Sequence, residues 1–113
     1  MSDLLPAAQA AARALDEKFG KDISLLEVGR ISTIADYFII ATGGNANQIT
    51  AMQDAAQETL HKHSVALRHT EGHKAANWVL LDFGSIVVHI FDEESRTFYN
   101  LERIWGDGLA VEY

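Results

Sequence analysis

The chain has 113 residues, which is the size of one ordinary domain. Hydrophobic residues make up 48% and charged residues 22%, a balance typical of a folded globular protein. No cysteine is present, which excludes disulfide scaffolds, thiolate zinc sites and cysteine nucleophiles. The net charge of −7 disfavours nucleic-acid binding by counterion release and favours partners with basic surfaces.

Targeting signals are not recognisable in the sequence. The longest apolar stretch, residues 78–91, is interrupted by Asp82 and His89 and is too polar for a membrane span. The N-terminus carries Asp3 and no basic residue before Arg13, which fits neither a secretory signal nor an Arg-rich transit peptide. We therefore expect a cytoplasmic protein.

The first predicted element is an amphipathic helix within residues 1–20. Leucine and alanine recur at helical spacing, and Phe19 continues the same apolar face. Ser2 or Asp3 can cap the start of this helix, and Gly20 can end it.

Two strands and a second helix are predicted next. Residues 23–28 favour a short strand, and residues 36–42 favour a central strand because they are apolar on both faces. A helix over 45–63 follows, with Asn45 and Gln48 at the spacing of a capping box. The inner face of this helix is expected to carry Ile49, Met52, Ala55, Ala56, Thr59 and Leu60.

The second half of the chain is predicted to hold three strands, a helical segment and a tail. Residues 65–69 favour a strand and residues 70–77 a polar loop. A hairpin over 78–91 follows, then a helical segment capped by Asp92 and a flexible tail over 106–113. The order αββαβββα predicts a single α/β domain of the α+β kind, with a mixed sheet and helices mainly on one side.

The hairpin carries the most information about function. Gly84-Ser85 suits a two-residue type II′ turn, which pairs Asp82 with Val87, Leu80 with His89 and so on along the strands. Side chains alternate between the two faces, and one face is entirely apolar, so it belongs on the helices. The other face, called the mixed face below, carries Trp78, Leu80, Asp82, Val87, His89 and Phe91.

The mixed face has the composition of a protein-binding surface. It combines an apolar centre with a few polar groups and a tryptophan, which is a favoured anchor at interfaces. The alternative is a second buried core layer in which Asp82 and His89 satisfy each other diagonally. Because both helices are needed on the apolar face, we expect the mixed face to be exposed or covered by an oligomer.

Catalytic and metal sites find little support in the sequence. Gly43-Gly44 lies between a strand and a helix and is able to cradle a phosphate, but nucleotidyl transfer also needs paired carboxylates for magnesium. The strand 65–69 has none, and Asp82 has no carboxylate two residues away. His61 and His63 point to different faces of a helix, which suits zinc chelation poorly. We expect no catalytic residue, no cofactor and no metal.

Several separate motifs occur in order along the chain. They are 35–40 (ADYFII), Thr42-Gly43 with Gln48, Glu71-Gly72, 78–84 (WVLLDFG), 87–91 (VVHIF) and 96–105 (RTFYNLERIW). Together they resemble the ribosomal silencing factor family, also called the Iojap family. The similarity runs from about Asp22 to Trp105 and departs from the family at Asn47, where a basic residue is common, and at Ser85, where Asp is usual.

The resemblance implies a nucleotidyltransferase-like fold that has lost catalysis, and a homodimer when the protein is free. It also implies binding to the large ribosomal subunit through ribosomal protein uL-fourteen. This binding blocks joining of the small subunit and represses translation, notably under nutrient limitation. The negative net charge and the mixed face agree with a basic ribosomal partner. We expect the protein to bind neither DNA nor a membrane.

The expected contact residues follow from the hairpin and the resemblance together. Trp78, Leu80 and Asp82 are the predicted contacts, and Glu71, Lys74, His89 and Tyr99 are their predicted neighbours. The alternative function is a small nucleotide-binding or nucleotidyl-transferring enzyme that uses Gly43-Gly44.

Overall fold

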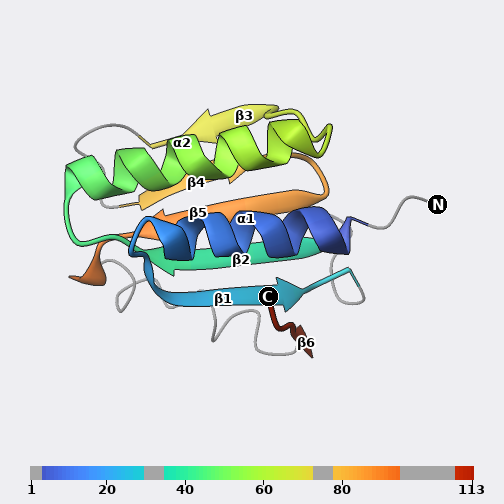
Figure 1. Ribbon diagram of the computed structural model, residues 1–113, viewed down its shortest axis with the longest axis horizontal. Helices are drawn as coiled ribbons and strands as arrows, with labels where there is room; N and C mark the ends of the chain where they lie inside the picture. The colour runs from blue at the N-terminus through green and yellow to red at the C-terminus, as the bar shows by residue number, and fades with distance from the viewer. Residues whose placement is uncertain (1–3, 30–34, 73–77, 95–108) are drawn as a thin grey trace.

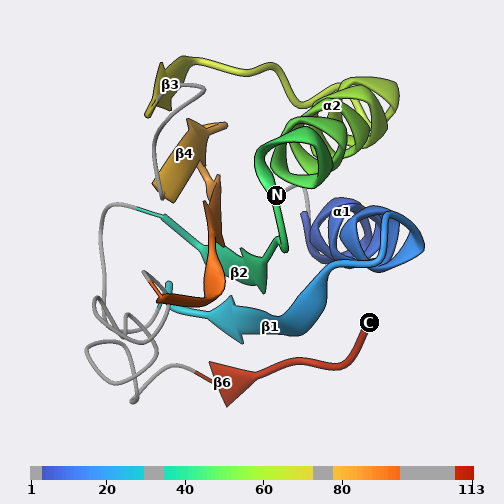
Figure 2. The same cartoon turned by 90° about the vertical axis from the view of Figure 1, so that its left-hand side faces the viewer.

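The computed structural model describes residues 4–29, 35–72, 78–94 and 109–113 (Figure 1). Within these residues, the helices α1 (Leu5–Glu17) and α2 (Ala46–Lys62) lie side by side on one face of a mixed sheet (Figure 2). The predicted α+β class is confirmed. The strands are β1 (Lys21–Glu27), β2 (Tyr37–Thr42), β3 (His69–Glu71), β4 (Trp78–Asp82), β5 (Ile86–Phe91) and β6 (Leu109–Ala110).

The sheet has the order β3-β4-β5-β2-β1-β6. Only β2 and β5 pair in parallel, and the other neighbours are antiparallel. All six residues of β2 are buried, as predicted for a central strand. A continuous apolar run suits this place because a strand in the middle of a covered sheet is shielded on both faces.

The main core lies between the sheet and the two helices. The inner side of α1 consists of alanines and Leu15, and the small alanine side chains let the helix pack closely on α2 and on the sheet. From α2, Ile49, Met52, Ala56 and Leu60 are buried as predicted, whereas Ala55 and Thr59 are half-buried. The apolar face of the hairpin completes this core with Val79, Leu81, Phe83, Ile86, Val88 and Ile90.

The end of α1 differs from the prediction. The helix stops at Glu17, and Phe19, rather than Gly20, takes the left-handed conformation at φ 64°. Phe19 is 81% exposed, so its predicted place on the apolar face is wrong. Gly20 is needed for space instead, because a Cβ there would lie 2.9 Å from the Leu15 carbonyl oxygen, a backbone atom that cannot move aside. Ser2 and Asp3 lie outside the described residues.

The third strand is also displaced from its predicted place over 65–69. The turn that ends α2 continues to Val65, whose N–H donates to the Leu60 carbonyl at 2.8 Å. Pairing with β4 begins only at Arg68, whose N–H donates to the Asp82 carbonyl at 2.8 Å. The strand β3 therefore spans His69–Glu71 and includes the start of the predicted loop 70–77. Residues 73–77 of that loop lie outside the described residues.

The prediction of a flexible tail is wrong from residue 109 onward. The strand β6 pairs with β1, and the Val111 N–H donates to the Leu25 carbonyl at 2.8 Å. The side chains of Gln9 and Arg13 on α1 donate to the carbonyls of Glu112 and Tyr113, at 2.9 and 2.8 Å. Backbone pairing at the open edge of β1 orders this segment despite its weak sequence signal. The helical segment predicted after Asp92 falls outside the described residues beyond Glu94.

Candidate docking surface

The hairpin has the predicted register. Trp78 pairs with Phe91, Leu80 with His89 and Asp82 with Val87. At the turn, Gly84 has a φ of +86°, as the first central position of a type II′ turn requires. The Asp82 carboxylate accepts a hydrogen bond of 2.7 Å from the Gly84 N–H, so it also stabilises this turn.

Five of the seven predicted site residues share the face of the sheet that points away from α1 and α2 (Figure 2). Trp78, Leu80 and Asp82 alternate along β4, and His89 is the pairing partner of Leu80 on β5. Glu71 on β3 pairs with Leu80 from the other side, which places it on the same face. The other two predicted residues, Lys74 and Tyr99, lie outside the described residues.

The mixed face is divided into a partly exposed half and a buried half. Trp78, Leu80 and Asp82 on β4 are half-buried. On β5, Val87, His89 and Phe91 are only 6%, 5% and 1% exposed, so the expectation of an open face is wrong for this strand. The alternative interpretation, a second buried core layer, is therefore correct for β5. The diagonal pairing of Asp82 with His89 that it included does not form, since Asp82 bonds to Gly84 and His89 to Trp78.

A small second core explains this burial. The strand β5 lies between β4 and β2, and β2 contributes Phe38 to the same side. Phe38 and Val87 pack with Val28 and Ala35, and the half-buried Leu80 borders this cluster. Among the described residues of this face, the surface available to a partner is therefore β4 with the adjoining Glu71.

Trp78 lies against two buried rings. Its indole Nε1–H donates to Nδ1 of His89 at 3.2 Å, and the two ring planes differ by 6° with centroids 6.0 Å apart. Phe91 is also parallel to the indole, with centroids 6.0 Å apart. Phe38 also contacts the His89 imidazole in an edge-on arrangement, with ring centroids 5.1 Å apart. These separations are within the range favoured for aromatic pairs.

His89 is uncharged at neutral pH. Its Nδ1 accepts the hydrogen bond from Trp78, so the single ring proton belongs on Nε2. Burial lowers the pKa of His89 from 6.5 to about 4 because the charged imidazolium loses its hydration. Nε2 is buried and has no hydrogen-bond partner among the described parts of the chain.

Acidic groups border the half-buried part of β4. The Glu71 carboxylate is paired with His69, whose Nε2 lies 2.7 Å from Glu71 Oε1. Both side chains are exposed. Such a surface pair contributes little to stability. A carboxylate at the rim of an apolar patch instead contributes to long-range attraction of a basic partner.

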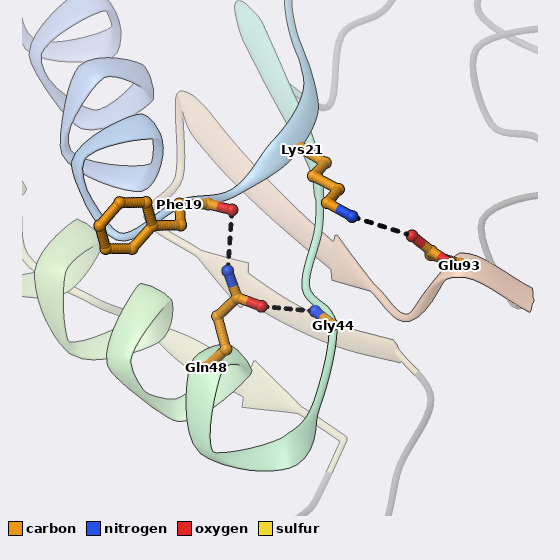
Figure 3. Close-up of polar contacts among 5 residues, drawn as sticks. All are labelled: Phe19, Lys21, Gly44, Gln48 and Glu93. Carbon is orange, nitrogen blue, oxygen red and sulfur yellow. Dashed lines mark hydrogen bonds and ion pairs between the residues drawn. The ribbon is translucent and has the colours of Figure 1, made fainter.

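The Gly43-Gly44 turn is used for packing inside the protein (Figure 3). The Gly44 N–H donates to the Gln48 side-chain oxygen at 2.6 Å, and the Gln48 N–H donates to the Asn45 side chain at 2.8 Å. A Cβ at Gly43 would lie 2.5 Å from Cγ1 of Ile49. Two of the amides at this helix N-terminus, those of Gly44 and Gln48, are therefore already bonded to side chains rather than open to a phosphate.

Gln48 also ties α2 to the end of α1. Its amide nitrogen donates to the Lys18 carbonyl at 3.0 Å. It also donates to the Phe19 carbonyl at 2.8 Å (Figure 3). The predicted capping box is thus half formed, since Asn45 caps the helix but Gln48 reaches Gly44 and α1 instead of the Asn45 backbone. Beside this cluster, Lys21 and Glu93 form an exposed ion pair at 3.5 Å (Figure 3).

The Gln48 cluster leads to a stability prediction. Gln48→Ala leaves three backbone groups without their partner, and we expect a loss of about 1–2 kcal/mol in the free energy of unfolding. Urea denaturation followed by circular dichroism measures this loss. Gln57→Ala, at an exposed position of the same helix, is the matched control and should change stability by less than about 0.5 kcal/mol. Equal stability of the two variants would contradict this role.

Comparison with known proteins identifies the family. Residues 2–112 match the family model described as "Ribosomal silencing factor during starvation". The chain belongs to the ribosomal silencing factor family. The resemblance in the hairpin and strand motifs is thereby confirmed.

Individual relatives agree with this assignment. A ribosomal silencing factor of Bacillus subtilis is 39% identical over 102 residues, covering 90% of this chain and 86% of the relative. The chloroplastic Iojap protein of Zea mays is 37% identical over 115 residues, covering 98% of this chain and 48% of that protein. A crystal structure of a Chromobacterium violaceum protein superposes with a TM-score of 0.87 at 31% identity, covering 93% of this chain and 88% of the other.

The sequence does not indicate that Phe38 packs beside the mixed face. Phe38 lies edge-on against His89, but both faces of the run 36–42 are apolar, so its pattern does not show which side chains share a face with His89. Knowledge that β2 adjoins β5 is needed to place Phe38 beside the mixed face. The neighbouring residues of β2, Tyr37 and Ile39, point to the main core instead.

Neither α1 nor α2, the helices of the described residues, has the length and apolar character that a membrane span requires.

Proposed function

We propose that this protein docks on the large ribosomal subunit through β4 and represses translation by blocking joining of the small subunit. The observation that carries this proposal is the row Trp78, Leu80 and Asp82 on β4, half-buried on the face away from the helices. Membership of the silencing factor family supports a ribosome-associated role. A cytoplasmic location follows from this proposal.

The physical features of the surface suit a basic protein partner, and we name ribosomal protein uL-fourteen. Trp78 and Leu80 supply apolar area at the centre, and tryptophan is enriched among residues that dominate binding energy. Asp82 and Glu71 place carboxylates beside this apolar area. The net charge of −7 favours approach to a basic surface.

The alternative function, a nucleotide-binding or nucleotidyl-transferring enzyme, is not supported by any observation at the Gly43-Gly44 turn. The Gly43 N–H donates to the Phe91 carbonyl, and the Gly44 N–H donates to the Gln48 side chain. Among the residues that the structure describes, no cluster of three His, Asp or Glu side chains is arranged to hold a metal ion. We therefore propose a role without catalysis and without a cofactor.

Co-sedimentation tests the proposed function. The protein is mixed with purified large or small ribosomal subunits in the absence of nucleotide, and the pellets are compared. We expect binding to the large subunit alone, and fewer joined ribosomes in a sucrose gradient when both subunits are present. Binding that appears only after a nucleotide is added would contradict the proposal and favour the enzyme.

The charge at the rim leads to a kinetic prediction. Glu71→Lys should slow association with the large subunit several-fold at low salt, because a repulsive charge would replace an attractive one. This difference should shrink as salt rises, since exposed charges are screened. Glu58→Lys, an equal charge reversal on the exposed side of α2, is the control and should slow association less. Equal rates for the two variants at low salt would contradict the role of Glu71.

We further propose that the free protein is a homodimer. The half-buried Trp78 and Leu80 form an apolar surface that a second copy can cover. Light scattering should therefore give twice the mass of one chain over a wide concentration range. A mass of one chain at every concentration would contradict the dimer.

A further inference from the structure

His89 occupies an unusual position for a histidine. It is only 5% exposed, its Nε2–H has no partner among the residues the structure describes, and its side chain lies on the central strand β5. An apolar residue at this place would avoid the cost of burying an unpaired polar group. Packing among the described residues therefore does not by itself account for a histidine here. Its Nδ1, however, accepts a hydrogen bond from Trp78.

The imidazole is held firmly by its neighbours. Phe38 packs edge-on against one part of the ring at 5.1 Å, and Phe91 lies parallel to it with centroids 6.3 Å apart. A ring confined in this way keeps the lone pair of Nδ1 in one direction. It is also kept neutral by burial, so Nδ1 remains free of a proton and able to accept.

The hydrogen bond selects one orientation of the indole. The terminal torsion of a tryptophan side chain has broad minima, and rotating the ring about it moves Nε1–H to the other side. In the observed orientation, Nε1 is 3.2 Å from Nδ1 and the planes differ by 6°, so donor and acceptor directions both lie close to the ring planes. A half-buried anchor fixed in this way loses less conformational freedom when it binds.

We propose that His89 is a positioning residue for docking: it holds the Trp78 indole in its binding orientation and does not itself touch the ribosome. This inference rests on the proposed function and replaces the expectation that His89 is a neighbouring contact. The residue acts through Trp78, because its own ring is covered. Preorganisation of one side chain corresponds to roughly a three- to tenfold difference in affinity.

Two substitutions separate positioning from simple packing. His89→Phe keeps an aromatic ring and removes the acceptor, so the melting temperature should not fall while affinity for large subunits drops roughly three- to tenfold. His89→Asn places a carbonyl oxygen close to the position of Nδ1 and should restore much of the lost affinity. His61→Asn, on the exposed end of α2, is the control and should leave affinity unchanged.

The indole proton gives a direct spectroscopic readout. The NMR signal of the Trp78 Nε1–H is assigned by its absence in Trp78→Phe, and its exchange with solvent is measured in each variant. We expect slow exchange in the wild-type protein and in His89→Asn, and faster exchange in His89→Phe. Faster exchange together with weaker binding and an unchanged melting temperature would support positioning, since lost packing alone would lower the melting temperature.

Three results would overturn the inference. The first is wild-type affinity in a folded His89→Phe protein while Trp78→Ala no longer binds, which would leave the proposed function intact. The second is low affinity in His89→Asn although the indole exchanges as slowly as in the wild type, which would make His89 a contact. The third is an absence of ribosome binding by the wild-type protein, which would remove the proposed function and this inference together.

Discussion

Trp78→Ala is expected to lower affinity for the large ribosomal subunit about 30-fold or more. Truncating an anchor of this kind typically costs about 2 kcal/mol or more, which corresponds to that factor. The indole is half-buried, and it packs against His89 and Phe91. The variant should consequently fail to co-sediment with large subunits and fail to block subunit joining at concentrations where the wild-type protein does both.

Folding has to be measured on the same preparation. Losing the contacts with His89 and Phe91 should also lower stability, but by less than the roughly 3–5 kcal/mol typical of a fully buried tryptophan. Val79→Ala is the matched control, because Val79 is the next residue on β4 and points into the main core. It should lower the melting temperature and leave the binding of the folded fraction unchanged. A folded Trp78→Ala protein that still blocks joining at wild-type concentrations would refute the proposed docking surface.

Acid is expected to remove about 3 kcal/mol of folding stability through His89 alone. Its pKa is about 4 in the folded protein and 6.5 in an unperturbed histidine. Between these values the unfolded chain binds a proton that the folded chain does not, so stability falls as the pH drops below 6.5 and levels off near 4. The difference of 6.5 − 4 = 2.5 pH units corresponds to about 3 kcal/mol.

Urea denaturation at a series of pH values measures this loss. Other groups titrate in the same range, so His89→Phe serves as the reference and the difference between the two proteins isolates the histidine. The reference should lose less stability than the wild type between pH 6.5 and 4. An identical pH dependence in the wild type and His89→Phe would contradict a buried neutral His89.

Local features of the fold were predictable from the sequence. The hairpin register follows from Gly84-Ser85, because a two-residue loop with a glycine at positive φ leaves one way to pair the adjoining strands. The start of α2 follows from Asn45, whose side chain accepts from the Gln48 N–H within one turn. In both cases the interacting residues are neighbours in the chain. The family is recognisable for a similar reason, since its motifs are short and appear in order.

Features that depend on distant segments were not predictable. The pairing of 109–110 with β1 is one such feature, because two residues carry no clear strand pattern and the pairing partner lies far away along the chain. The place of Phe19 at the end of α1 was likewise not predictable, and neither was the close contact at Gly20, where a Cβ would lie 2.9 Å from the Leu15 carbonyl oxygen and 2.8 Å from Cε of Met52 on α2.

The character of the mixed face was decided in part by the sequence and in part by the tertiary structure. Alternation along β4 and β5 determined which side chains share this face, because pleating fixes the direction of each one. Only the parallel pairing of β2 with β5 decided that His89 would be buried, since that pairing sets Phe38 beside it. Alternation is a property of each strand, whereas burial depends on which strands become neighbours.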